Sequence, residues 1–131
     1  MTRTSIIHLL LKIIAAVILL QTLYFKFTAA PESVYIFETL GLEPVERIGI
    51  GVLELLTAIL LLVPRTTGLG AVLGMGILGG AIFSHLTQLG IEVQNDGGTL
   101  FILAVITFII CCYLAWHHRF DIPILKNLLG K

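Results

Sequence analysis

Residues 99–116 read TLFILAVITFIICCYLAW, an apolar run without a single charged side chain. A helix needs about 20 mostly apolar residues to cross about 30 Å of hydrocarbon, so this run is long enough to span a membrane. Three more runs are mostly apolar and of similar length, at about residues 5–27, 44–63 and 67–89. All four are too long for strands and lack period-two alternation, which indicates helices. The sequence therefore predicts an all-α integral membrane protein, a bundle of four transmembrane helices.

The composition supports the same class. The chain has 131 residues, of which 57% are hydrophobic and 12% are charged, and its mean hydropathy is +1.04. A soluble domain is usually about 45–50% apolar and about a quarter charged, and a chain this short cannot hide the surplus inside. A soluble enzyme is therefore excluded. A net charge of zero argues against a nucleic-acid partner. We expect a single membrane domain over residues 1–131.

Prolines and glycines predict where the helices begin and end. Pro44 suits the first turn of the second span, and Pro64 stops that helix. Gly90 suits the C-terminal cap of the third span, and residues 95–98, NDGG, have a turn composition. Residues 31–40 lie between the first two spans and have apolar residues at helical spacing. They predict a short amphipathic extracytoplasmic helix, on the membrane surface or capping the bundle.

The charges are divided between the two sides of the membrane. Four spans place both termini and residues 64–66 on one side, which then carries six of the eight basic residues. The positive-inside rule places that side, with a tail at 117–131, in the cytoplasm. Removal of the first run as a signal peptide would leave three spans and spoil this asymmetry. The six basic residues are Arg3, Lys12, Arg65, Arg119, Lys126 and Lys131.

Glu54 is the strongest candidate for a functional residue. It lies ten residues beyond Pro44, which is about 15 Å along a helix and close to the midplane. Arg47 and Gly51 precede it at helical spacing and share its face. An ionisable side chain is costly in lipid, so it marks a functional site by default.

Other polar residues lie at depths that can converge on Glu54. Helical side chains lean toward the N-terminus of their own helix, so Glu54 leans outward, while Gln21 and His85 lean inward. This predicts a polar pocket in the outer half of the bundle. In the alternative interpretation, Glu54 has a structural role only, and a buried Glu–His or Glu–Arg pair holds the helices in register. The candidates are Glu54 and His85 for proton exchange and ligand hydrogen bonding, and Gln21, Lys26, Arg47 and Gln88 for substrate binding.

Several chemistries are not expected. Cys111 and Cys112 are adjacent and do not form a C-x-x-C redox motif. His85 lies near the outer face and the other three histidines near the inner one, which argues against a bis-histidine haem. No metal-ligand set is expected. The third span carries small-residue pairs, Gly70/Gly74 and Gly76/Gly80, which predict close packing within the chain or, alternatively, a homo-oligomer.

Four short motifs in this order resemble DoxX-like membrane proteins: QTLYFKF at 21–27, GVLEL at 51–55, PRT at 64–66 and AIFSHL at 81–86. The resemblance covers about residues 6–118. It implies a four-helix bundle in the bacterial inner membrane and an association with redox functions. Relatives include a subunit of a thiosulfate:quinone oxidoreductase and a component of an oxidative-stress membrane complex. The positions that match the family pattern are Lys26, Glu54 and His85.

Three functions stay open at this point. The first is a redox-associated subunit whose pocket binds a quinone or a small substrate, an oxidoreductase subunit rather than a stand-alone enzyme. The second is a transport component for a small solute or protons. The third is a structural or assembly factor. The bilayer is the expected partner, together with other membrane or redox subunits, and the cofactor is unknown.

Overall fold

The computed structural model describes residues 3–93 and 96–119, and the regular structure in these residues is helical. The tail predicted at 117–131 is described only as far as residue 119. A 3-10 turn at Pro64–Thr66 joins α3 to α4, and α4 continues into a π-helical turn, η2, at His85–Leu89. The α-helices are α1 (Arg3–Phe27), α2 (Pro31–Thr39), α3 (Val45–Leu62), α4 (Thr67–Ser84) and α5 (Thr99–His117).

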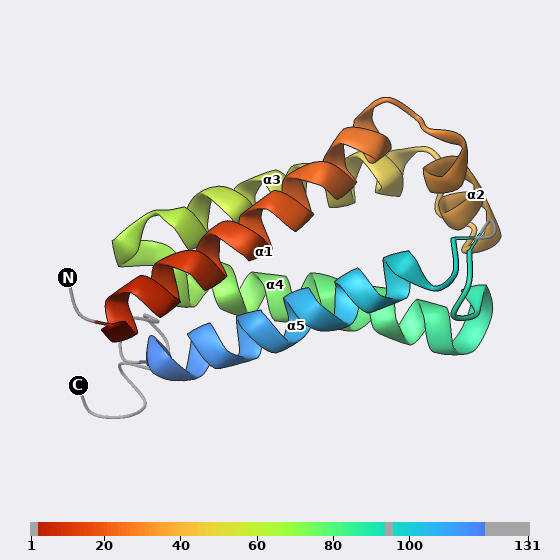
Figure 1. Ribbon diagram of the computed structural model, residues 1–131. Coiled ribbons are helices and arrows are strands. Elements are labelled where there is room, and N and C mark those ends of the chain that lie inside the picture. The colour runs from red at the N-terminus through yellow and green to blue at the C-terminus, as the bar shows by residue number, and fades with distance from the viewer. Residues whose placement is uncertain (1–2, 94–95, 120–131) are drawn as a thin grey trace.

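The four long helices form two antiparallel pairs, α1 with α3 and α4 with α5. The pairs meet at one end, where the turn at 64–66 lies, and they spread apart toward the other end (Figure 1). The short helix α2 lies at the spread end and contacts α1, α3 and η2. We call these the closed end and the α2 end. The helix predicted at 31–40 is thus confirmed, and it caps the bundle.

Proline and glycine bound the helices as predicted. Pro44 is the N-cap of α3, which ends at Leu62, two residues before Pro64. Gly90 has a φ of +79° and follows the last residue of η2. Since a left-handed φ is strained for other residues, glycine is the residue that ends a helix in this way.

Two glycines of α4 allow close helix packing within the chain. A Cβ atom added at Gly74 would lie 2.5 Å from Cys111 Sγ, and one at Gly70 would lie 2.8 Å from the Leu61 nitrogen. These two positions therefore bring α4 against α5 and α3. Gly76 and Gly80 differ, because a Cβ at either would meet nothing within 4 Å.

Three segments are long and apolar enough to cross a membrane: Arg3–Phe27, Pro64–Leu89 and Thr99–His117. Large apolar side chains cover the outside of the bundle, and Ile109, for example, is 60% exposed. The chain is therefore an all-helical membrane protein in contact with the bilayer. The helix α3 does not qualify by composition, because its 18 residues include Glu46, Arg47 and Glu54. Composition thus supports three spans rather than the predicted four.

Candidate functional site

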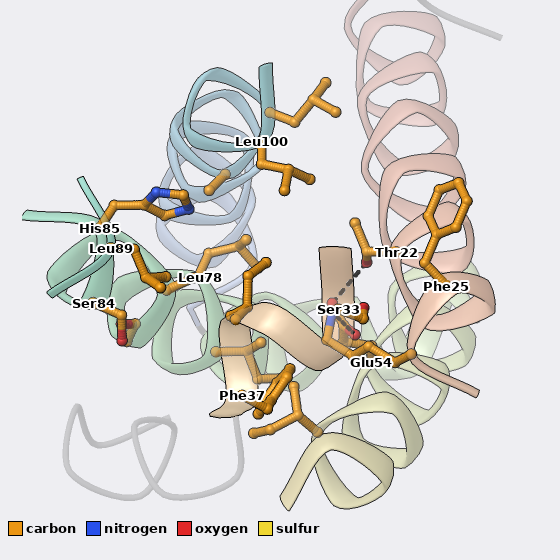
Figure 2. Close-up of a pocket in the computed structure, with 18 of the residues that line it drawn as sticks. Thr22, Phe25, Ser33, Phe37, Glu54, Leu78, Ser84, His85, Leu89 and Leu100 are labelled. Carbon is orange, nitrogen blue, oxygen red and sulfur yellow. Dashed lines mark hydrogen bonds and ion pairs between the residues drawn. The ribbon is translucent and has the colours of Figure 1, made fainter. Parts of the chain in front are cut away.

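The α2 end of the bundle holds a cavity of about 540 Å³ (Figure 2). This volume is typical of small-molecule sites, which range over about 300–1,000 Å³. Its wall is formed by all five α-helices together with η2, and most of the lining side chains are apolar. The glycines Gly76 and Gly80 also lie on this wall. The polar side chains on the wall include Thr22, Lys26, Ser33, Glu54, His85 and Asp96.

A buried ion pair, Lys26 with Glu54, lies on one wall of the cavity. Lys26 comes from the last turn of α1 and Glu54 from the middle of α3, and Lys26 Nζ lies 2.9 Å from Glu54 Oε1. The two side chains are only 14% and 4% exposed. Thr22 Oγ1 donates a hydrogen bond of 2.7 Å to Glu54 Oε2. Buried charges are tolerated when they are paired and hydrogen-bonded, so each group stabilises the other.

Arg47 does not line the cavity, although it contacts the main chain of Lys26. Its Nε donates to both carboxylate oxygens of Glu43, at 2.8 and 2.9 Å. Its Nη1 donates to the main-chain carbonyl of Lys26. The last carbonyls of a helix have no partner within that helix, so this buried guanidinium caps α1. Arg47 thereby holds the residue that carries the cavity's ammonium group.

His85 lies on the opposite side of the cavity from Glu54 (Figure 2). It is the first residue of η2 and is 5% exposed. Its Nδ1 donates a 2.8 Å hydrogen bond to the Gly90 carbonyl, which can only accept, so Nδ1 carries a proton. The ring also makes an edge contact with Phe101, with centroids 5.5 Å apart. In the neutral ring, Nε2 is therefore the acceptor that remains for a ligand. Single π-helical turns are common at functional sites.

Asp96 orders the loop that closes the cavity beside His85. Its carboxylate accepts hydrogen bonds from the backbone N–H groups of Val93, Gly98 and Leu100, at 3.0, 2.8 and 3.1 Å. Burial raises the pKa of Asp96, but the three donors and the electrostatic effect of the nearby His85 together outweigh burial. The pKa therefore lies below the ordinary value of 3.8. The ionised carboxylate also suits the positive N-terminal end of α5.

The structure brings three of the predicted site residues together and leaves others apart. Lys26, Glu54 and His85 line the same cavity. Gln21 and Gln88 are exposed on the outside of the bundle and do not line it. Within residues 3–93 and 96–119, no group of three or more His, Cys, Asp or Glu side chains is arranged to hold a metal ion.

Four lining residues were absent from the candidates predicted from the sequence: Thr22, Ser33, Phe37 and Asp96. Thr22 lies one helical turn before Lys26 on the same face, so helical spacing could have found it. Ser33 and Phe37 have the same four-residue spacing and form the buried face of α2. Asp96 reaches the cavity from a loop, where no periodic pattern marks which residues face inward.

The fold and the site define a helical membrane protein with an apolar cavity that holds one ion pair and one imidazole. The sequence model of the DoxX-like family matches residues 10–112, which include Lys26, Glu54 and His85. The chain therefore belongs to the DoxX-like family, as its motifs predicted. No curated protein matches the sequence, and no solved structure matches it either.

Proposed function

We propose that the cavity binds a small, largely apolar molecule with a hydrogen-bonding head, and that a quinone is this ligand. One observation carries the proposal: an apolar cavity of about 540 Å³ has the Lys26–Glu54 pair on one side and His85 on the other. A quinone has a flat apolar ring with an oxygen at each side, so its two polar atoms match two opposed polar groups.

The three side chains have distinct roles in this proposal. The ammonium of Lys26 has three donors and can serve Glu54 and one ligand oxygen together. In the quinol form, the hydroxyl at the other side donates to Nε2 of His85. Oxidation of a quinol to a quinone releases two electrons and two protons. Nε2 of His85 and the Glu54 carboxylate are the groups that accept these protons, and a partner redox protein takes up the electrons. The chain is thus a subunit rather than a stand-alone enzyme.

We further infer that α3 is a fourth span. Its 18 residues extend about 27 Å, and it packs along both α1 and α4. Its Arg47 and Glu54 are buried and paired, with Glu43 and Lys26 respectively, which lowers the cost of placing charges in a membrane. Four spans put the closed end, with its basic residues, in the cytoplasm of a bacterial cell. The cavity then faces the outer side of the inner membrane.

Binding can be measured with a tryptophan reporter. The chain has a single tryptophan, Trp116, so a Trp116→Phe, Phe37→Trp protein carries its indole on the cavity wall. A benzoquinone with a decyl tail, titrated into this protein in nanodiscs, should quench its fluorescence and reach saturation. Lys26→Met and His85→Phe should each weaken binding about tenfold, which is the loss of a hydrogen bond to a charged or buried partner.

The matched control is Gln88→Ala, which changes a polar residue on η2 that lies outside the cavity. It should leave the dissociation constant unchanged. Quenching that never saturates, or equal affinities in the site variants and the control, would rule out the proposed ligand site.

A further inference from the structure

We propose that the cavity is filled from the side, through an entrance between α1 and α5 that opens into the hydrocarbon. The ligand class is then an amphiphile dissolved in the bilayer, with its head in the cavity and its apolar tail between these two helices. This inference rests on the proposed function, because it assumes that the cavity binds an apolar ligand with a hydrogen-bonding head.

Contacts between α1 and α5 occur at the closed end. There His8 Nε2 lies 3.3 Å from the Tyr113 hydroxyl, and the His8 ring lies 5.1 Å from the ring of His117. From this junction the two helices diverge toward the α2 end (Figure 1). The cavity reaches both helices in the region where they have separated, since residues 18–26 of α1 and 99–104 of α5 contribute to its wall.

The other sides of the cavity are closed by close packing or by α2. A Cβ atom at Gly51 of α3 would lie 2.6 Å from the Phe27 ring of α1, and the His85 ring at the end of α4 makes an edge contact with the Phe101 ring of α5. The two helices of each pair are therefore in contact at the depth of the cavity. The helix α2 lies across the spread end, and its buried Phe37 points into the space between α3 and α4 (Figure 2). In Figure 1, no helix of the described residues lies across the side between α1 and α5.

Apolar side chains of both α1 and α5 line the cavity, and we take them as the rim of the side entrance. Ile18 and Phe25 line the cavity from α1, and they lie seven residues apart on one helix face. Leu100 and Leu103 line it from α5, and Figure 2 shows Leu100 pointing into the space between the two helices. Phe25 is 38% exposed, so the rim is in contact with the surroundings of the bundle. An apolar tail favours such a passage, whereas a hydrated, charged solute would lose its water there.

The test measures how fast the ligand arrives as well as how tightly it binds. In the reporter protein, Leu100→Phe with Leu103→Phe narrows the rim from α5, while Ile109→Phe adds the same ring on the lipid-facing side of that helix, outside the cavity wall. Stopped-flow mixing with vesicles that contain the decyl-tailed benzoquinone should give an association rate about tenfold lower for the rim variant. The control should keep the parent rate.

A second rim variant, Ile18→Phe, narrows the same passage from α1. It keeps the test conclusive even if the α5 variant folds poorly. It should also slow association. A tail-less, water-soluble benzoquinone is the second probe, and it should bind the parent protein at least about tenfold more weakly, because it lacks the tail contacts.

The outcomes separate the two proposals. If the tailed benzoquinone never gives saturable quenching in the parent protein, the proposed function fails. If quenching saturates but both rim variants keep the association rate of the control, the side entrance is wrong while the ligand site stands. Equal affinities for the tailed and tail-less benzoquinones would likewise contradict the proposal that the ligand is an amphiphile dissolved in the bilayer.

Discussion

Lys26 Nζ lies 2.9 Å from Glu54 Oε1, and this contact joins the last turn of α1 to the middle of α3 on the cavity wall. The pair has two roles. It compensates two charges that are removed from water, and it places an ammonium group and a carboxylate beside the space for a ligand. A structural role and a binding role predict different responses to substitution, so they can be distinguished.

Removal of one partner should destabilise the protein. Glu54→Gln leaves the Lys26 ammonium buried without its counter-ion, which costs about 3–5 kcal/mol in buried pairs. We expect a large fall in the thermal midpoint in detergent. The double variant Lys26→Met, Glu54→Gln removes both charges and should recover most of this loss, but not the affinity for the benzoquinone. If the double variant is as unstable as the single one, the charge compensation is not what stabilises this wall.

Arg47→Lys should also lower stability, although it keeps the charge. A lysine cannot reproduce the planar fork that contacts Glu43 and the Lys26 carbonyl together. We expect a loss of about 1–3 kcal/mol, as for a hydrogen bond to a charged group. The control is Arg65→Lys, because Arg65 is exposed in the turn between α3 and α4. Equal thermal midpoints for the two variants would contradict the capping role.

Two glycines of α4 should respond to alanine with opposite signs. At Gly74, the new methyl group would meet Cys111 Sγ at 2.5 Å, so Gly74→Ala should lower the thermal midpoint. At Gly76, a methyl group meets nothing within 4 Å. Gly76→Ala should therefore raise stability by about 0.5–1 kcal/mol through helix propensity alone. Thermal unfolding of both variants in the same detergent tests this prediction. Thermal midpoints that shift in the same direction in both variants would contradict the packing described for α4.

The lowered pKa of Asp96 predicts that the folded protein loses stability in acid. This pKa is lower in the folded chain than the ordinary value of 3.8. The folded state therefore gains stability above that value and loses it as the pH falls through the lower, folded-state pKa. Thermal midpoints of the parent and of Asp96→Asn should differ most near neutral pH and should approach each other in acid. A difference that does not depend on pH would show that the charge of Asp96 plays no part.

The sequence predicted the helices well, because the signals for them are local. Apolar runs set the lengths, and Pro44, Pro64 and Gly90 set the boundaries. The divergence of the two helix pairs and the place of α2 between them depend on contacts far apart in the chain, so no local pattern carries them. The π-helical turn that begins at His85 was also not predicted, since the expected third span at about residues 67–89 treated these residues as part of one regular helix.

The depth of a polar residue along its helix was easier to predict than the direction in which its side chain points. The depth of Gln21 is close to that of Thr22, but a step of one residue turns the side chain by about 100°, and Gln21 lies outside while Thr22 lines the cavity. The buried pairs expected for Glu54 were Glu–His and Glu–Arg, and the partner found is Lys26. The structure pairs Lys26 with Glu54 and Arg47 with Glu43, a choice that depends on helix rotation rather than on sequence spacing.

Photolabelling reports where the ligand lies, and it therefore tests whether the cavity is the ligand site. A decyl-tailed benzoquinone with a diazirine on its ring can be irradiated with the protein in nanodiscs, and the labelled residues can be identified by mass spectrometry. We predict labels on the cavity wall, at Phe37, Leu78 and Leu103, which unlabelled benzoquinone removes by competition. Labels confined to the lipid-facing residues Val52 and Ile109, unchanged by the competitor, would contradict a ligand site in this cavity.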